Sequence, residues 1–153
     1  MHTIGSHWWY PAHYTRSQAR WTPEVDSRIV SEMSRAQIVN SYDNTILASD
    51  SFWKAVIDRL RGSRSIVIFI SDHGESLGED GRWIHSADAP EVRSTACFVW
   101  YSPKYASFYP QKVAALRANA HRRVSTDYIF HTVLDAGAIT TPVLDRGRSL
   151  LAK

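Results

Sequence analysis

The segment Ser65–Ile70 (SIVIFI) places the strongest constraint on the fold, because it is a short, nearly uninterrupted run of β-branched and aromatic residues. Such a run predicts a strand that is buried on both faces, as in a parallel sheet covered by helices. Thr95–Tyr101 (TACFVWY) is a second run of this kind. Two strands are few for a sheet that buries both of its faces. The chain is therefore expected to need helices as cover.

Helices are predicted around these strands. Ser34 and Gln37 have the spacing of a capping box, and apolar residues then recur at helical spacing over residues 35–61. Further helices are predicted over residues 111–120 and 126–136. The order helix, strand, loop, strand, helix indicates an α/β fold.

The first part of the chain has a different character. Residues 1–33 are rich in His, Trp, Tyr and Pro and show no periodicity, which predicts a long loop. The α/β part is then expected over residues 34–153, within one domain. The opening decapeptide has no basic and no apolar region of the kind that a signal peptide needs.

Composition narrows the class of protein. A chain of 153 residues with 44% apolar residues is globular rather than disordered. No apolar run reaches the length of a membrane span. Cys97 is the single cysteine, which excludes an internal disulfide and a CxxC metal site. The net charge of +3 suits an anionic partner such as a phosphate or a lipid head group, and it equally suits an ordinary soluble surface.

The loop after the first strand carries the residues best suited to chemistry. Asp72 and His73 follow the strand directly, and ligands of open α/β sheets bind at such strand ends. A carboxylate beside an imidazole suits zinc, although a structural role is the alternative for such a pair. Gly74 would let the backbone turn so that both side chains converge. His85 lies twelve residues beyond His73 and could fold back over the same strand end, or be an ordinary surface histidine.

Other conspicuous residues are predicted to be structural. Ser76 has no GxSxG context for a nucleophile, so it is expected to cap the loop. The basic run 121–123 is expected to be a solvated helix end, with phosphate binding as the alternative. The tryptophans are expected to pack in a core or an interface. The histidines without an evident partner, also read as structural, are His2, His13, His121 and His131.

Four segments together resemble a known family. They are HTIGSH at residues 2–7, YDNT at 42–45 (read as a helix entry), SDHGESLGE at 71–79 followed by GxxxH ending at His85, and STDYIFHT at 125–132. In this order they resemble the C-terminal part of the alkaline-phosphatase/sulfatase superfamily. The likeness is greatest to the bacterial phosphoethanolamine transferases, which modify lipid A and related envelope glycans.

The resemblance implies roles for four residues. Asp72 and His73 match two ligands of that family's catalytic zinc. His7 and His85 match residues that contact the phosphate of phosphoethanolamine or a second zinc. In the family, zinc activates a threonine, which accepts phosphoethanolamine from a phospholipid and passes it to lipid A or a glycan at the periplasmic face of the bacterial inner membrane.

The same resemblance implies that the chain is partial. The family's nucleophilic threonine, its glutamate zinc ligand and its membrane-spanning region lie upstream of HTIGSH, so no catalytic nucleophile is expected here. The sheet is expected to be an incomplete portion of an alkaline-phosphatase-like fold, inactive alone and prone to self-association. No nucleic-acid partner is expected. The alternatives are a sulfatase or phosphodiesterase of the same superfamily, and a non-catalytic α/β assembly module.

Overall fold

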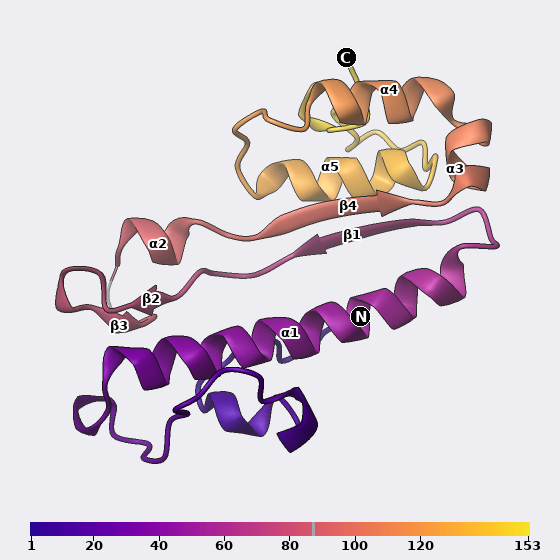
Figure 1. The fold of residues 1–153 in the computed structure, drawn as a ribbon. Coiled ribbons are helices and arrows are strands. Elements are labelled where there is room, and N and C mark those ends of the chain that lie inside the picture. Colours follow the sequence, from indigo (N-terminus) through magenta and orange to yellow (C-terminus); the bar gives the residue numbers. More distant parts are fainter. Residues whose placement is uncertain (87) are drawn as a thin grey trace. The chain divides into compact units, whose positions relative to one another are not determined.

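The computed structural model describes residues 1–86 and 88–153 (Figure 1). Residue contacts divide the chain into two compact units, Met1–Asp58 with Ile70–Cys97 and Arg59–Phe69 with Phe98–Lys153. The prediction of a single domain stays a prediction. Within the described residues, no helix is both long and apolar enough to span a membrane.

The predicted elements form close to their expected bounds, which confirms the α/β fold class. The helices are α1 (Arg35–Leu60), α2 (Pro90–Arg93), α3 (Pro103–Phe108), α4 (Pro110–Ala118) and α5 (Asp127–Ala136), and the strands are β1 (Ile66–Ile70), β2 (Ser76–Leu77), β3 (Trp83–Ile84) and β4 (Cys97–Tyr101). At the start of α1, the capping box is confirmed. The Ser34 N–H donates to Gln37 Oε1 at 2.9 Å, and the Gln37 N–H donates to Ser34 Oγ at 3.3 Å.

The expectation of doubly buried strands in a parallel sheet is wrong. β1 and β4 pair only with each other among the described residues, and their arrows point in opposite directions in Figure 1. Hydrogen bonds from Ser71 N to Ala96 O and from Ser102 N to Ser65 O fix this antiparallel register. All five residues of β1 are half-buried. A two-stranded sheet leaves one edge of each strand without a neighbour, so strands of this composition cannot be enclosed within it.

One face of the β1–β4 pair packs against a small apolar core. Ile66, Ile68, Val99 and Tyr101 contact a buried cluster of Leu116, Ala136, Leu150 and Leu151. The alternation of these positions is that of strands with one covered face. The Phe69 and Phe98 rings stack with centroids 5.1 Å apart, and Phe98 remains 36% exposed.

Residues 1–33 are held by α1 rather than by regular structure of their own. Three short 3₁₀ helices occur in this segment, at Tyr10–Ala12, Arg16–Gln18 and Val30–Glu32. Asn44 is fully buried in α1, and its amide binds the backbone N–H groups of Arg20 and Trp21 and the Trp21 carbonyl. Residues 42–45 therefore lie inside α1, not at its entry, and act as an anchor for the segment.

An aromatic core completes this unit. Tyr10, Val25, Met33 and Ile38 are buried, and they are surrounded by half-buried residues from the first segment, α1 and the β2–β3 hairpin: Trp8, Trp9, Tyr14, Val30, Tyr42, Leu77 and Trp83. The packing role expected for Trp8, Trp9 and Trp83 is thus confirmed. Because Leu77 and Trp83 face each other in the hairpin register, the hairpin is fixed to the same core as the start of the chain.

Candidate functional site

Asp72 and His73 lie in the loop that leaves β1, where the sequence analysis places them. The Asp72 side chain is 87% exposed and the His73 side chain 33%. The His73 N–H donates to Asp72 Oδ1 at 3.1 Å, and the same oxygen lies 3.9 Å from His73 Nε2. The two side chains therefore do converge, with one carboxylate oxygen beside one imidazole nitrogen.

Gly74 is required for a reason other than the one expected from sequence. Its backbone packs directly against α2, and its N–H donates to Val92 O at 2.7 Å. A Cβ at this position would lie 2.0 Å from the Glu91 carbonyl oxygen and 2.8 Å from that of Ser94. Close approach of two backbones, and not a left-handed turn, is what demands glycine here.

The β2–β3 hairpin brings His85 back beside His73. Ser76 pairs with Ile84 and Leu77 with Trp83 in antiparallel register, and Glu75 and His85 are the residues directly before Ser76 and directly after Ile84. Glu75 Oε1 accepts a hydrogen bond from His85 Nδ1 at 2.9 Å, and the Glu75 side chain is only 5% exposed. The His73 and His85 ring centroids are 4.3 Å apart. The return of His85 to the strand end is thus a product of hairpin pairing.

His7 reaches the same place from the first segment. Its ring centroid lies 5.8 Å from that of His85. The structure therefore brings together His7, His73 and His85, with Asp72 beside His73. His131 instead accepts a hydrogen bond from the Asp145 N–H, as befits the structural role expected for it.

The three clustered histidines share one hydrogen-bonding pattern. His7 Nδ1 bonds to the Trp8 carbonyl, His73 Nδ1 bonds to the Gly74 carbonyl at 2.8 Å, and His85 Nδ1 bonds to the Glu75 carboxylate. Carbonyl and carboxylate oxygens only accept, so Nδ1 carries the proton in each ring. The Nε2 atom of each imidazole is therefore left to bind a ligand, and a metal-binding histidine is commonly held in this way.

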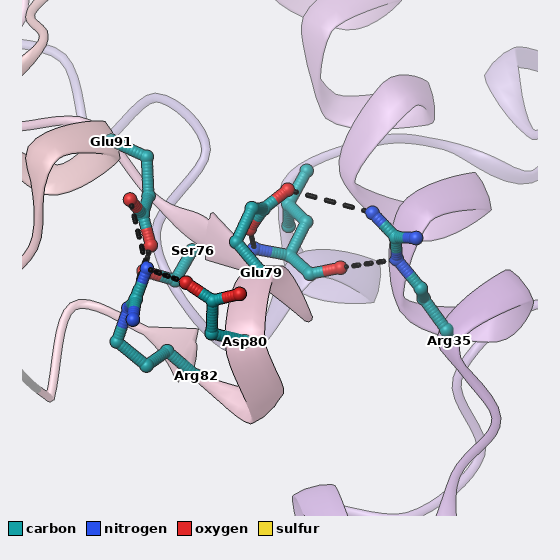
Figure 2. A network of polar contacts seen from close by, with 7 residues as sticks. Arg35, Ser76, Glu79, Asp80, Arg82 and Glu91 are labelled. Carbon is teal, nitrogen blue, oxygen red and sulfur yellow. Dashed lines mark hydrogen bonds and ion pairs between the residues drawn. The ribbon is translucent and has the colours of Figure 1, made fainter.

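A polar network holds the hairpin in place (Figure 2). Glu91 of α2 accepts hydrogen bonds from Ser76 Oγ at 2.8 Å and Arg82 Nε at 3.0 Å. These bonds, with that of Arg82 first, lower the Glu91 pKa to about 2. Ser76 is buried and bound to Glu91, which supports its structural interpretation.

The opposite side of the hairpin is tied to the start of α1, also in Figure 2. Arg35 Nε donates to the Leu77 carbonyl at 2.8 Å, and its guanidinium lies 3.5 Å from Glu79 Oε1. Gly78, with a φ of 103°, forms the turn in the left-handed region that glycine favours. The hairpin is thus bound to α2 on one side and to α1 on the other.

Two tyrosines of the aromatic core are affected by the charge of Glu75. Tyr10 is fully buried, and its hydroxyl has no hydrogen-bond partner within the described part of the chain. Burial, and then the nearby negative charge of Glu75, raise the pKa of both Tyr10 and Tyr42. The buried Glu75 carboxylate is therefore near enough to both phenol groups to act on their pKa, and it is hydrogen-bonded to His85.

The donors present suit a zinc ion but do not complete its coordination. Ligands at about 2.0–2.2 Å from a tetrahedral zinc lie roughly 3.4 Å apart, so a small rotation would let Asp72 Oδ1 and His73 Nε2 share one ion. Across residues 1–86 and 88–153, however, no three His, Cys, Asp or Glu side chains are grouped to hold a metal.

Sequence reasoning missed the residues that position the histidines. In the sequence, nothing distinguishes Glu75, Arg82 and Glu91 from ordinary charged residues of a loop or helix. The strands β2 and β3 have two residues each and are too short to show an alternating pattern. The signal available was the spacing itself. Residues 75 and 85 pair only if a tight turn is centred near residue 80.

Comparison with known proteins then identifies the family. The Sulfatase family profile matches residues 1–139. The chain belongs to the sulfatase family. A curated relative, the Kdo(2)-lipid A phosphoethanolamine 7''-transferase of Salmonella typhimurium, is 34% identical over 150 residues. The match covers 93% of this chain and 26% of the relative, so the chain spans about a quarter of that protein's length.

Solved structures share the fold. The soluble domain of lipooligosaccharide phosphoethanolamine transferase A from Neisseria meningitidis is 34% identical with a TM-score of 0.90, covering 99% of this chain and 48% of that one. The C-terminal periplasmic domain of EcEptC from Escherichia coli, solved in complex with Zn, is 19% identical with a TM-score of 0.79, covering 97% of this chain and 43% of that one. The latter likeness concerns the fold alone.

Proposed function

We propose that this sulfatase-family chain forms the histidine-bearing part of a phosphoethanolamine transferase that acts on lipid A or a related envelope glycan. The observation that carries the proposal is the convergence of His7, His73 and His85 at the end of β1, each with Nδ1 occupied and Nε2 left for a ligand. A relative with this activity matches 93% of the chain.

The geometry supports a proposed role for each residue. Asp72 and His73 would hold a zinc ion, because a carboxylate oxygen and an imidazole nitrogen lie side by side there. When bound, zinc lowers the pKa of a hydroxyl nucleophile and offsets developing phosphoryl charge. His7 and His85 would bind the phosphoryl oxygens of phosphoethanolamine or a second zinc. Ser76 is excluded as nucleophile because its hydroxyl is buried on Glu91, so we assign the nucleophile to another part of the whole protein.

The setting proposed for the whole protein follows from its relatives. A phospholipid would be the donor of phosphoethanolamine, and the transfer would take place at the periplasmic face of the inner membrane. The chain alone would be inactive and would bind zinc weakly, because Asp72 and His73 are only two of the three or more ligands that a catalytic zinc site needs. A sulfatase of the same family remains the second candidate, since the matching family is described as Sulfatase.

Substitution of His85 tests the transferase assignment. The His85 side chain is 36% exposed, but His85→Ala leaves the buried Glu75 carboxylate without this hydrogen bond, so the free energy of unfolding should fall by about 1–3 kcal/mol. Loss of one group that stabilises phosphoryl charge should lower the transfer rate by roughly a hundred- to a thousand-fold. Melting and phosphoethanolamine transfer are measured on the same full-length variant.

His131→Ala is the matched control, because His131 lies in α5 and outside the cluster. His131→Ala should leave the transfer rate within about twofold of wild type, after correction for any decrease in the fraction of folded protein. Retained transfer by His85→Ala with a large fall in melting temperature would return His85 to a structural role. Sulfate-ester hydrolysis by the full-length protein, without phosphoethanolamine transfer, would instead select the sulfatase.

A further inference from the structure

Glu75 stands out among the acidic residues of the site loop because its carboxylate is buried and bound to a histidine. Its side chain is 5% exposed, whereas those of Asp72 and Asp80 are 87% and 83% exposed. We infer that Glu75 is a positioning residue, which holds the His85 ring with the proton on Nδ1 and presents Nε2 to the ligand. What His85 then binds rests on the function proposed above.

The chemistry of the contact fixes the tautomer. A carboxylate offers only lone pairs, so the 2.9 Å contact between Glu75 Oε1 and His85 Nδ1 requires that Nδ1 donate. The neutral ring then has its lone pair on Nε2, the nitrogen that can bind a metal. The Glu75 side chain is only 5% exposed, so little water competes for its carboxylate and the hydrogen bond to His85 is strengthened.

The backbone supports the same arrangement. Glu75 and His85 directly flank the paired residues Ser76 and Ile84 at the base of the β2–β3 hairpin. Ile84, directly before His85, has a φ of 53°, a left-handed conformation that β-branched residues rarely adopt. Strain of this kind persists only where the surroundings fix the conformation, and it gathers at functional sites. The hairpin network at Glu91 and Arg35 provides that fixation.

Glu75 differs from the anchors of the other two histidines in a way that allows a test. His7 and His73 are held by the carbonyls of Trp8 and Gly74, which no substitution removes. His85 is held by a side chain. Of the three tautomers in the cluster, that of His85 is therefore the one that a point substitution in its anchor can release.

The experiment reads the tautomer directly in this chain, without metal or substrate. Long-range ¹H–¹⁵N spectra of ¹⁵N-histidine-labelled protein at neutral pH distinguish a protonated from an unprotonated ring nitrogen, and the loss of one spin system in His85→Gln assigns His85. In wild type, His85 should carry its proton on Nδ1. A wild-type spectrum with the proton on Nε2 would overturn the inference without any variant at Glu75.

Two substitutions at Glu75 distinguish the effect of its hydrogen bond to His85 from the effect of its side-chain volume. Glu75→Leu fills a similar volume but accepts no hydrogen bond, so His85 should shift toward the Nε2–H tautomer that free histidine prefers in water. Glu75→Gln keeps a carbonyl acceptor and should restore the Nδ1–H tautomer. Glu79→Gln is the matched control, since Glu79 lies in the same loop but binds Leu77 N and Arg35, and it should leave the His85 signals unchanged.

The full-length protein links the tautomer to function. Removal of a residue that orients a ligand-binding histidine typically costs about 10–100-fold in metal affinity or activity, so transfer by Glu75→Leu should fall by that factor and recover in Glu75→Gln. An unchanged His85 tautomer in Glu75→Leu overturns the positioning role. A changed tautomer with full transfer upholds positioning and overturns the function proposed for His85, which keeps the two failures distinct.

Discussion

At the scale of single residues, the site is organised by groups that carry no chemistry of their own. Gly74 allows α2 to pack closely against the loop because it has no side chain. The Glu75 carboxylate hydrogen-bonds to His85, and backbone carbonyls hydrogen-bond to His7 and His73. The position at a strand end predicts Asp72 and His73 as site residues, and the family resemblance implies roles for His7 and His85. Glu75 is not predicted, because the sequence alone does not show whether a glutamate side chain is buried or exposed.

Gly74 gives a sharp test at this scale. In Gly74→Ala, the new Cβ would meet the Glu91 carbonyl at 2.0 Å, so α2 or the loop must move. We expect a loss of about 2–3 kcal/mol in the free energy of unfolding, measured by urea denaturation. Gly62→Ala is the control, because a Cβ there has no atom within 4 Å, and it should cost almost nothing. Equal stability of the two variants would contradict the close approach.

At the scale of elements, predictability follows element length. α1 has 26 residues with a capping box and a clear apolar period, and it forms almost where predicted. β2 and β3 have two residues each, and their pairing depends on Gly78 and on side chains of α1 and α2 that no local pattern reveals. The antiparallel sense of β1 and β4 was also beyond the sequence, because an apolar run fits either direction of pairing.

The hairpin network should make stability depend on pH. Because Glu91 has a folded pKa of about 2, below its ordinary 4.5, its contribution is complete above pH 4.5 and is lost as the pH falls toward 2. Glu91→Gln should therefore be less stable than wild type at pH 7, and the difference should shrink by pH 3. Urea unfolding at the two pH values measures it. A difference that stays constant with pH would show that Glu91 acts only by its shape.

Asn44 tests how α1 holds the first segment. Asn44→Ala removes the amide that binds Arg20 N, Trp21 N and Trp21 O, all in a buried setting. We expect a loss of about 2–3 kcal/mol in the free energy of unfolding, with faster amide exchange across residues 1–33. Asn40→Ala is the comparison, because Asn40 is exposed in its contact with Pro23 O and makes one bond where Asn44 makes three. Similar losses in both variants would argue against Asn44 as the main anchor.

At the scale of the whole molecule, the sheet and several apolar side chains lack cover. Phe130 and Val133, three residues apart on one face of α5, are 54% and 49% exposed. Phe98 on β4 is 36% exposed. The solved domain that the chain resembles is about twice as long as this chain. The apolar pattern of the sequence correctly predicts residues suited to a protein interior, but it overestimates how many of them are buried in this chain.

Such surfaces favour self-association of the chain. Exposed sheet edges and apolar faces pair with other chains, so the sedimentation coefficient should rise with protein concentration. Phe98→Lys places a charge on the sheet and should reduce this rise. Lys104→Glu in α3 is a charge-changing control away from the strands, and it should not. A compact monomer at every concentration would contradict the prediction.

The register of the β2–β3 hairpin has a consequence for how such chains can vary in length. Residues added in equal number on the two sides of the tip, between Gly78 and Arg82, lengthen the hairpin and leave Glu75 and His85 beside the Ser76–Ile84 pair at its base. One residue inserted between Ile84 and His85 moves the histidine away from that pair and from the Glu75 carboxylate. Among related proteins, the length of the hairpin should thus vary at its tip and stay constant at its base. A motif search that fixes the number of residues between His73 and His85 would therefore overlook proteins that retain the same geometry.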